Sequence, residues 1–356
     1  MKRKLAIFTL LLFCTLLLGG NIPAATQEQE TIKLNLSQAV ERALTSNLEF
    51  QKAGYTWQNA EIEAKKEQAE NLLTQSTLLK RQVELSLLEK QEQYQQGKED
   101  LIRQVVDEYL QLKLAQKDLQ LKEKELELEK NLLEKVKTQV KGGHKAEIDL
   151  LEQNTEYYDA LFSLESAKLE YQKSLGNFRI TLGLKANSQV ELAALVTPDF
   201  PEIELEEAWQ KGKQNSVALQ MSSLKIEVAT RELEKNKVSD IPEVDLKVLE
   251  NNLALAQLEY QITQQNLDYQ IQSEWQNYVQ SKNDILSNQN SLNQIKANQT
   301  IISDQVQAGL ASEDQELSAI IGVLEAEYRL ASSVRNYYKA RLNLLSLIGD
   351  LSEGEV

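Results

Sequence analysis

Few side chains in this sequence could perform catalysis or bind a metal. His144 is the only histidine and Cys14 is the only cysteine. A disulfide needs two cysteines, and a structural zinc site needs several Cys or His ligands. The sequence also contains no Gly-rich phosphate loop, no nucleophile elbow and no cluster of metal-binding residues. We therefore expect no enzyme activity, no cofactor and no metal, and we assign no catalytic residue.

The overall charge excludes one further class of function. The formal net charge is −15 at pH 7. Nucleic-acid binding depends on stripes of Lys and Arg that neutralise phosphates, so we expect no nucleic-acid partner. Helix breakers are scarce, with four Pro and thirteen Gly in 356 residues, while Leu, Glu, Gln, Lys and Ala are abundant. This composition is typical of long helices or coiled coils.

Two glycine turns separate the longest apolar repeats. Gly142 and Gly143 form the first turn, and Gly309 lies in the second. Before the first turn, apolar residues recur every seven positions at Val105, Leu112, Leu119, Leu126, Leu133 and Val140. After it, the same spacing appears at Leu150, Tyr157, Leu164, Tyr171 and Phe178. Seven-residue spacing predicts coiled-coil helices, and a short glycine turn between them predicts an antiparallel hairpin.

The hairpin occurs twice in the sequence. The segment 139–183 aligns without a gap on 305–349 at a constant offset of 166. Each copy begins with a short helix, for which we predict Ser37 as the N-cap in the first copy. The fold class predicted is all-α, with two tandem repeats of long antiparallel coiled-coil hairpins. The predicted boundaries are repeat one at 34–184, a linker at 185–202, repeat two at 203–350 and a C-terminal tail at 351–356.

The N-terminus has the pattern of a secretory signal peptide. A basic start at residues 2–4 precedes an apolar run at 5–18, which Gly, Asn and Pro then interrupt. This order predicts a signal peptide at residues 1–25 and a location outside the cytoplasm. An uncleaved anchor and a lipid-modified Cys14 are the weaker alternatives, because the run is short and Cys14 lies inside it.

At this point the sequence resembles the TolC family of outer-membrane efflux proteins, whose members are tandem repeats of such hairpins. The pattern Leu36-Ser37-x-x-Val40-x-x-Ala43-Leu44-x-x-Asn47 is similar to the opening of each family repeat. The spacing from Gly143 to Asp149 resembles the family's hairpin tip. The resemblance implies a trimer whose hairpins close into a hollow helical cylinder. It also implies that the hairpin tips dock a membrane-fusion adaptor.

The tips implied by the resemblance supply the candidate site residues. They are Val140, Gly142, Gly143 and Asp149 in the first copy, and Val306, Gly309 and Gln315 in the second. Gln315 departs from the pattern, since the first copy has Asp149 at that place. Both turns could equally be plain helix-hairpin turns. Asp149 could line a duct, or it could only stabilise the N-terminus of its helix.

A second departure concerns the strands that family members insert into the outer membrane. A membrane strand needs about 9–11 residues that alternate between apolar and polar, with turn residues between strands. The two windows where such hairpins would lie, 68–101 and the residues after Leu246, are helical in composition. We therefore expect both β-hairpins of the membrane barrel to be absent.

Three classes of function remain open. The first is a TolC-like component of an efflux or export system, either a helical conduit or an adaptor-docking cylinder, working with an adaptor and an inner-membrane pump. The second is a structural coiled-coil protein of the cell envelope with no transport role. The third is a membrane-fusion adaptor, although those proteins also carry β-rich domains. In each case the protein would be periplasmic or associated with the outer membrane.

Overall fold

The computed structural model describes residues 31–194, 198–239 and 241–352. The predicted signal peptide lies outside these residues. Eight helices and two short strands make up the described chain, and the predicted all-α fold is confirmed. In chain order they are β1 (Thr31–Leu34), α1 (Leu36–Ser46), α2 (Leu48–Thr74), α3 (Thr77–Lys141), α4 (Glu147–Thr181), β2 (Gln189–Leu192), α5 (Leu205–Asn215), α6 (Val217–Val238), α7 (Glu243–Gln307) and α8 (Glu313–Leu347).

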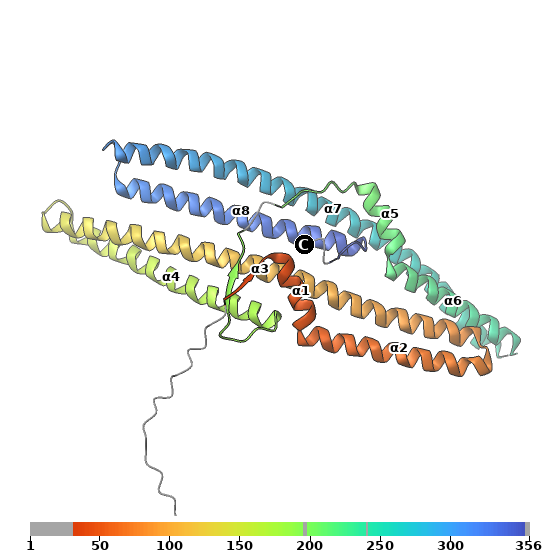
Figure 1. Cartoon of the computed structure of the whole chain (residues 1–356). Coiled ribbons are helices and arrows are strands. Elements are labelled where there is room, and N and C mark those ends of the chain that lie inside the picture. The colour runs from red at the N-terminus through yellow and green to blue at the C-terminus, as the bar shows by residue number, and fades with distance from the viewer. Residues whose placement is uncertain (1–30, 195–197, 240, 353–356) are drawn as a thin grey trace, which may run out of the picture.

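Two helices run the whole length of the molecule. α3 and α7 have 65 residues each, which corresponds to about 98 Å. In one half of the molecule the helices pack side by side in the order α4, α3, α8, α7. In the other half α2 and α6 take the places of α4 and α8, so the order is α2, α3, α6, α7 (Figure 1).

The main core lies near the middle of the long helices, where the short elements gather. Val105 on α3 and Ile271 on α7 are fully buried there, as is Phe178 at the end of α4. Each belongs to an apolar repeat, and the seven-residue spacing places it on the face that meets the neighbouring helix. Away from this core the helices pack in a row with no second layer over them, and many apolar side chains of the described chain are exposed.

Polar side chains of the long helices fasten the connecting segments across the core. The indole of Trp275 donates a hydrogen bond to the carbonyl oxygen of Ile203 at 2.7 Å, and the phenol of Tyr278 donates to that of Pro201. The Tyr337 hydroxyl donates to the carbonyl oxygen of Asp199 at 2.9 Å. These bonds satisfy backbone groups that would otherwise lack partners beside a packed core.

The sequence did not indicate the strands. β1 and β2 pair in parallel, with Thr31 opposite Gln189 and Leu34 opposite Leu192. The Lys113 ammonium donates to the carbonyl oxygen of Leu192 at 2.9 Å and so joins this sheet to α3. The two strands are far apart in the sequence, and each is only 4 residues long, so no local pattern predicts their pairing.

The prediction that Ser37 caps the first helix is wrong. α1 begins at Leu36, and its N-cap is Asn35. The Asn35 side chain accepts the Gln38 N–H at 2.8 Å, and the Gln38 side chain accepts the Asn35 N–H at 3.0 Å. This reciprocal pair is a capping box, which satisfies two backbone donors where a cap at Ser37 would leave Gln38 unused.

Both windows considered for membrane strands are helical, as predicted. The first holds the end of α2, a turn at Gln75 and Ser76, and the start of α3. The second lies within α7. Within the described part of the chain, no helix combines the length and the hydropathy that crossing a bilayer requires.

Candidate functional site

The first hairpin tip joins α3 to α4 through five residues. Gly142 is the C-cap of α3, and Gly143 has φ = +75°, a conformation that favours glycine. The N–H groups of Gly143 and His144 donate back to the carbonyls of Val140 and Gln139, at 3.0 and 2.8 Å. This bonding satisfies the last carbonyls of α3 and turns the chain back sharply.

The second tip repeats this geometry with different residues. Gly309 has φ = +72°, and its N–H donates to the carbonyl of Val306 at 2.9 Å. Asp149 and Gln315 hold equivalent places at the starts of α4 and α8. The Asp149 carboxylate accepts the Ala146 N–H, and the Gln315 side chain accepts the Ser312 N–H, each at 2.8 Å. Gln315 therefore makes the same capping bond as Asp149, although the residue type differs.

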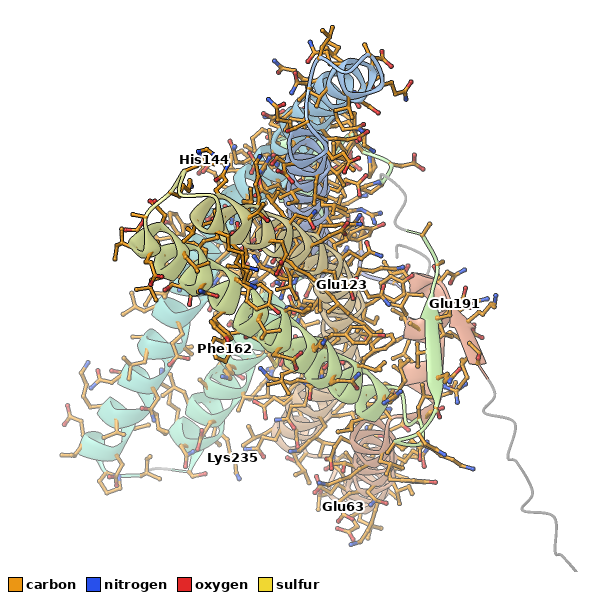
Figure 2. The ribbon with its side chains drawn as sticks, turned by 90° about the vertical axis from the view of Figure 1, so that its left-hand side faces the viewer. Glu63, Glu123, His144, Phe162, Glu191 and Lys235 are labelled. Carbon is orange, nitrogen blue, oxygen red and sulfur yellow. The ribbon has the colours of Figure 1, made fainter. Side chains whose placement is uncertain are left out.

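The two tips lie at the same end of the molecule (Figure 1). Their apolar side chains are accessible, since Leu310 is 80% exposed and Ile148 is 58% exposed. His144 is exposed on the first tip and faces the viewer in Figure 2. Among the described residues no group of three His, Cys, Asp or Glu side chains could hold a metal ion.

The two copies of the hairpin meet where α3 packs on α8, and charged pairs mark this junction. The Arg335 guanidinium donates two hydrogen bonds to the Asp107 carboxylate, at 2.8 and 2.9 Å. The Glu327 carboxylate accepts from Lys117 on α3 at 3.1 Å and from Lys296 on α7 at 2.9 Å. Burial alone would raise the pKa of Glu327, but the two lysines hold it below its usual range.

At one edge of the row, no helix of the described chain covers the outer side of α4, and this side is apolar. On α4, exposed apolar residues recur mostly at spacings of three, four or seven. Apart from Ile180 near the end of the helix, they are Ile148, Leu151, Tyr158, Phe162 and Leu169, each at least 53% exposed. Phe162 is 68% exposed and stands on the outer side of α4 in Figure 2. Such a stripe is the seam that a coiled-coil helix presents to a partner.

The offset of 166 relates this outer stripe to the junction between the copies. Two residues of α8 form ion pairs with α3: Asp314 pairs with Lys135, and Arg335 pairs with Asp107. One repeat earlier the same positions hold Ile148 and Leu169 on α4. The outer face of α4 is thus the counterpart of a face that is already used for packing inside the chain.

The opposite half of the molecule has two further unpartnered stripes. The stripe on α2 consists of Leu48, Tyr55 and Ile62, which are seven apart. The stripe on the first half of α7 consists of Val248, Leu255, Leu258, Ile262 and Tyr269. The sequence analysis did not single out these outer stripes. The signal was present as apolar residues beside each main heptad, but only the packing order shows which of them stay uncovered.

Comparison with known proteins identifies the fold. No protein-family model and no curated protein sequence matches the chain. Solved structures do match it. The CmeC outer membrane channel of Campylobacter jejuni is 12% identical, with a TM-score of 0.65 over 90% of this chain and 88% of that chain. The outer membrane protein VceC of Vibrio cholerae is 11% identical, with a TM-score of 0.63 over 88% and 96%. The outer-membrane channel OprN is 16% identical, with a TM-score of 0.64 over 89% and 90%.

The chain therefore has the helical fold of bacterial outer-membrane channels. Within that class the matching proteins are TolC-type efflux channels, so the predicted resemblance to this family is confirmed at the level of the fold.

Proposed function

We propose that the chain assembles head to tail into a closed trimer, and that this ring is the helical conduit of an efflux or export system outside the cytoplasm. The outer face of α4 is the observation that supports the proposal most. Its apolar stripe is exposed to solvent, which is unfavourable. The counterpart of this face on α8 packs against α3, a long helix of the same chain. The long helix at the free edge is α7, the counterpart of α3.

The arrangement of edges favours a ring over a twofold dimer. Each chain has α2 and α4 at one edge and α7 at the other, so one edge of a copy would pack on the other edge of its neighbour. Such head-to-tail contacts either close into a ring or continue as a filament. In the ring, α4 would meet α7 of the next copy, and the stripe on α2 would meet the first half of α7.

The hairpin tips are the proposed docking surface for a membrane-fusion adaptor, which would connect the ring to an inner-membrane pump. The candidate residues are Val140, Gly142, Gly143, Asp149, Val306, Gly309 and Gln315. Their backbone bonds and caps account for the shape of each turn, while the exposed Leu310 and Ile148 offer apolar contact area. The same geometry also serves a plain turn, so docking has to be tested apart from assembly.

Solution mass tests the assembly. Purified protein without residues 1–25 should sediment with the mass of three chains. Phe162→Glu combined with Leu169→Glu places two charges on the α4 stripe and should shift the mass to one chain, because unpaired charges are costly at a packed interface. Leu310→Glu is the matched control, since it places a charge on an exposed leucine that lies outside both edges. A wild-type monomer would contradict the ring.

Cross-linking tests which edges meet. The chain has no cysteine after Cys14, so in protein without residues 1–25 only the introduced cysteines can form disulfides. Tyr55→Cys combined in turn with Leu255→Cys, Leu258→Cys and Ile262→Cys should give a disulfide between chains in at least one register. Tyr55→Cys with Leu310→Cys should give none.

The shape of the assembly separates the conduit from the alternative of a structural envelope protein. Electron microscopy of the trimer should show an open axis along the helices, whereas a solid bundle would favour the structural role. With an adaptor purified from the same cell, Val306→Glu together with Leu310→Glu should weaken binding by about tenfold or more and leave the trimer intact. Unchanged binding would remove docking from the tips.

A further inference from the structure

The contact of α8 with α3 inside the chain has a counterpart between neighbouring chains. Near the tips, the Lys135 ammonium of α3 lies 3.4 Å from the Asp314 carboxylate of α8. If α4 of one chain met α7 of the next, these helices would repeat that contact, because the offset of 166 relates α4 to α8 and α3 to α7. The places of Asp314 and Lys135 would then be taken by Ile148 and Ile301.

Both isoleucines are accessible in the single chain. Ile148 is 58% exposed at the start of α4, and Ile301 is 56% exposed near the end of α7. An ion pair in the junction within the chain therefore corresponds to two apolar side chains at the outer edges. Contact between these side chains would remove apolar surface from water on both helices, which is favourable.

A pair of opposite charges accompanies the two isoleucines. Lys145 precedes Ile148 by three residues, and Asp304 follows Ile301 by three, so an antiparallel contact brings the two charges to the same level. Lys145 and Asp304 are both exposed, and neither forms an ion pair within the described part of the chain. Inside the chain the corresponding positions are uncharged, since they hold Ala311 and Thr138.

The surroundings of these two charges leave them available. Between Lys296 and Arg329 the sequence has no cation, so the turn that follows Asp304 offers it no partner. The acids nearest to Lys145 in the sequence are Glu147 and Asp149. The Asp149 carboxylate accepts the Ala146 N–H at 2.8 Å as the cap of α4.

We propose that neighbouring copies of this chain recognise each other beside the tips through contact of Ile148 with Ile301 and through an ion pair of Lys145 with Asp304. The inference rests on the ring proposed above and names the residues that join its chains. The two contacts are one helical turn apart, so sliding α4 along α7 would break both of them. They thus fix the register that keeps the tips of all copies level.

The difference between the two junctions also prevents their exchange. If α4 packed on α3 of another copy, Ile148 would lie against Lys135. If α8 packed on α7 of another copy, Asp314 would lie against Ile301. In both arrangements a charge loses its partner and part of its water without compensation, which disfavours the exchanged pairing.

Exchange of charges tests the ion pair in protein without residues 1–25, with the mass in solution as the readout. Lys145→Glu and Asp304→Lys each place like charges opposite one another. Each should weaken the trimer by about tenfold or more, since a ring has three such contacts. The variant with both substitutions restores opposite charges and should regain most of the wild-type association. Because both residues are exposed, circular dichroism should show the same helix content in every variant.

Disulfide formation tests the apolar contact. Ile148→Cys with Ile301→Cys should form a disulfide between chains, because α3 and α8 separate these helices within one chain. Ile148→Cys with Tyr269→Cys is the matched control and should form none. Tyr269 is 73% exposed on the same helix, but it lies 32 residues, or about 48 Å, from Ile301.

The outcomes separate this contact from the ring itself. A wild-type monomer contradicts both. If the wild type is a trimer and the two single charge variants remain as strongly associated, the ring stands and the contact is overturned. A trimer whose Ile148→Cys and Ile301→Cys variant forms no disulfide has the same meaning. If each single variant weakens the trimer and the double variant does not recover, Lys145 does not pair with Asp304 and the proposal is wrong.

Discussion

Arg335 on α8 and Asp107 on α3 form a two-bond ion pair that joins the two halves of the chain. The bonds are 2.8 and 2.9 Å long, and the residues are 228 apart in the sequence. The carboxylate matches both donor groups of the guanidinium, which restricts how α8 slides along α3. The pair therefore favours one register of the contact between the two copies of the hairpin, together with the buried side chains of α3 and α8.

A double-mutant cycle should measure this pair. Arg335→Ala, Asp107→Ala and the double variant should show a coupling energy of about 1 kcal/mol in urea unfolding, because both side chains remain partly exposed. In 1 M NaCl the coupling should fall by about half or more, since salt screens an exposed pair. Coupling that is absent at low salt would mean that the pair does not hold the register.

Glycines with the same backbone strain should differ in how they tolerate a side chain. Gly143→Ala should cost about 1 kcal/mol of unfolding free energy, because φ is positive but the space around it is open. Gly183→Ala should cost about 2 kcal/mol or more, because its Cβ would lie 2.8 Å from the Ser46 carbonyl oxygen. Gly97→Ala, inside α3 with open space, should instead stabilise by about 0.5–1 kcal/mol. Equal costs at Gly143 and Gly183 would refute this ranking.

Glu327 should make stability depend on pH. Burial raises its pKa, but hydrogen bonds from Lys296 and Lys117 lower it more, so the folded-state pKa lies below the ordinary value of 4.5. A group with a depressed pKa stabilises the fold above its unfolded-state pKa, and this contribution is lost as the pH falls through the folded value. The melting temperatures of wild type and Glu327→Gln should differ at pH 7, and the difference should shrink as the pH falls below the ordinary carboxyl range. A difference that does not change with pH would assign the effect to packing.

The hydroxyl of Tyr337 should contribute more than that of Tyr109. Tyr337→Phe removes a bond of 2.9 Å to the Asp199 carbonyl and should cost about 1 kcal/mol. The bonds from Tyr109 to two carbonyls are 3.4 Å long, so Tyr109→Phe should cost less, about 0.5 kcal/mol.

Both tyrosine costs should be constant from pH 6 to pH 9. Burial raises the pKa of Tyr109 to about 12 and raises that of Tyr337 as well, so both phenols stay neutral. Urea unfolding at several pH values checks the ranking, and a larger cost at Tyr109 would contradict it.

The candidate tips were predictable because their determinants are local. Gly143 and Gly309 allow positive φ, and each follows a helix with apolar residues seven apart. Those two signals lie within a few residues of each turn. The same locality explains the error at Ser37, since Asn35 and Ser37 are both good caps and only the bond to Gln38 separates them.

By itself, the sequence determined the long helices beside the glycine turns, those turns and the helical character of the two windows, and through them the resemblance to the TolC family. Heptad spacing and glycine conformation act between neighbouring residues, so a single chain records them directly. The tertiary structure decided which helix packs on which, from the strand pairing of Thr31 with Gln189 to the ion pair of Asp107 with Arg335. It alone shows that Phe162 on α4 and Leu73 in the last turn of α2 stay uncovered. Those choices depend on how surfaces far apart in the sequence match in shape and charge, which the spacing along one segment does not encode.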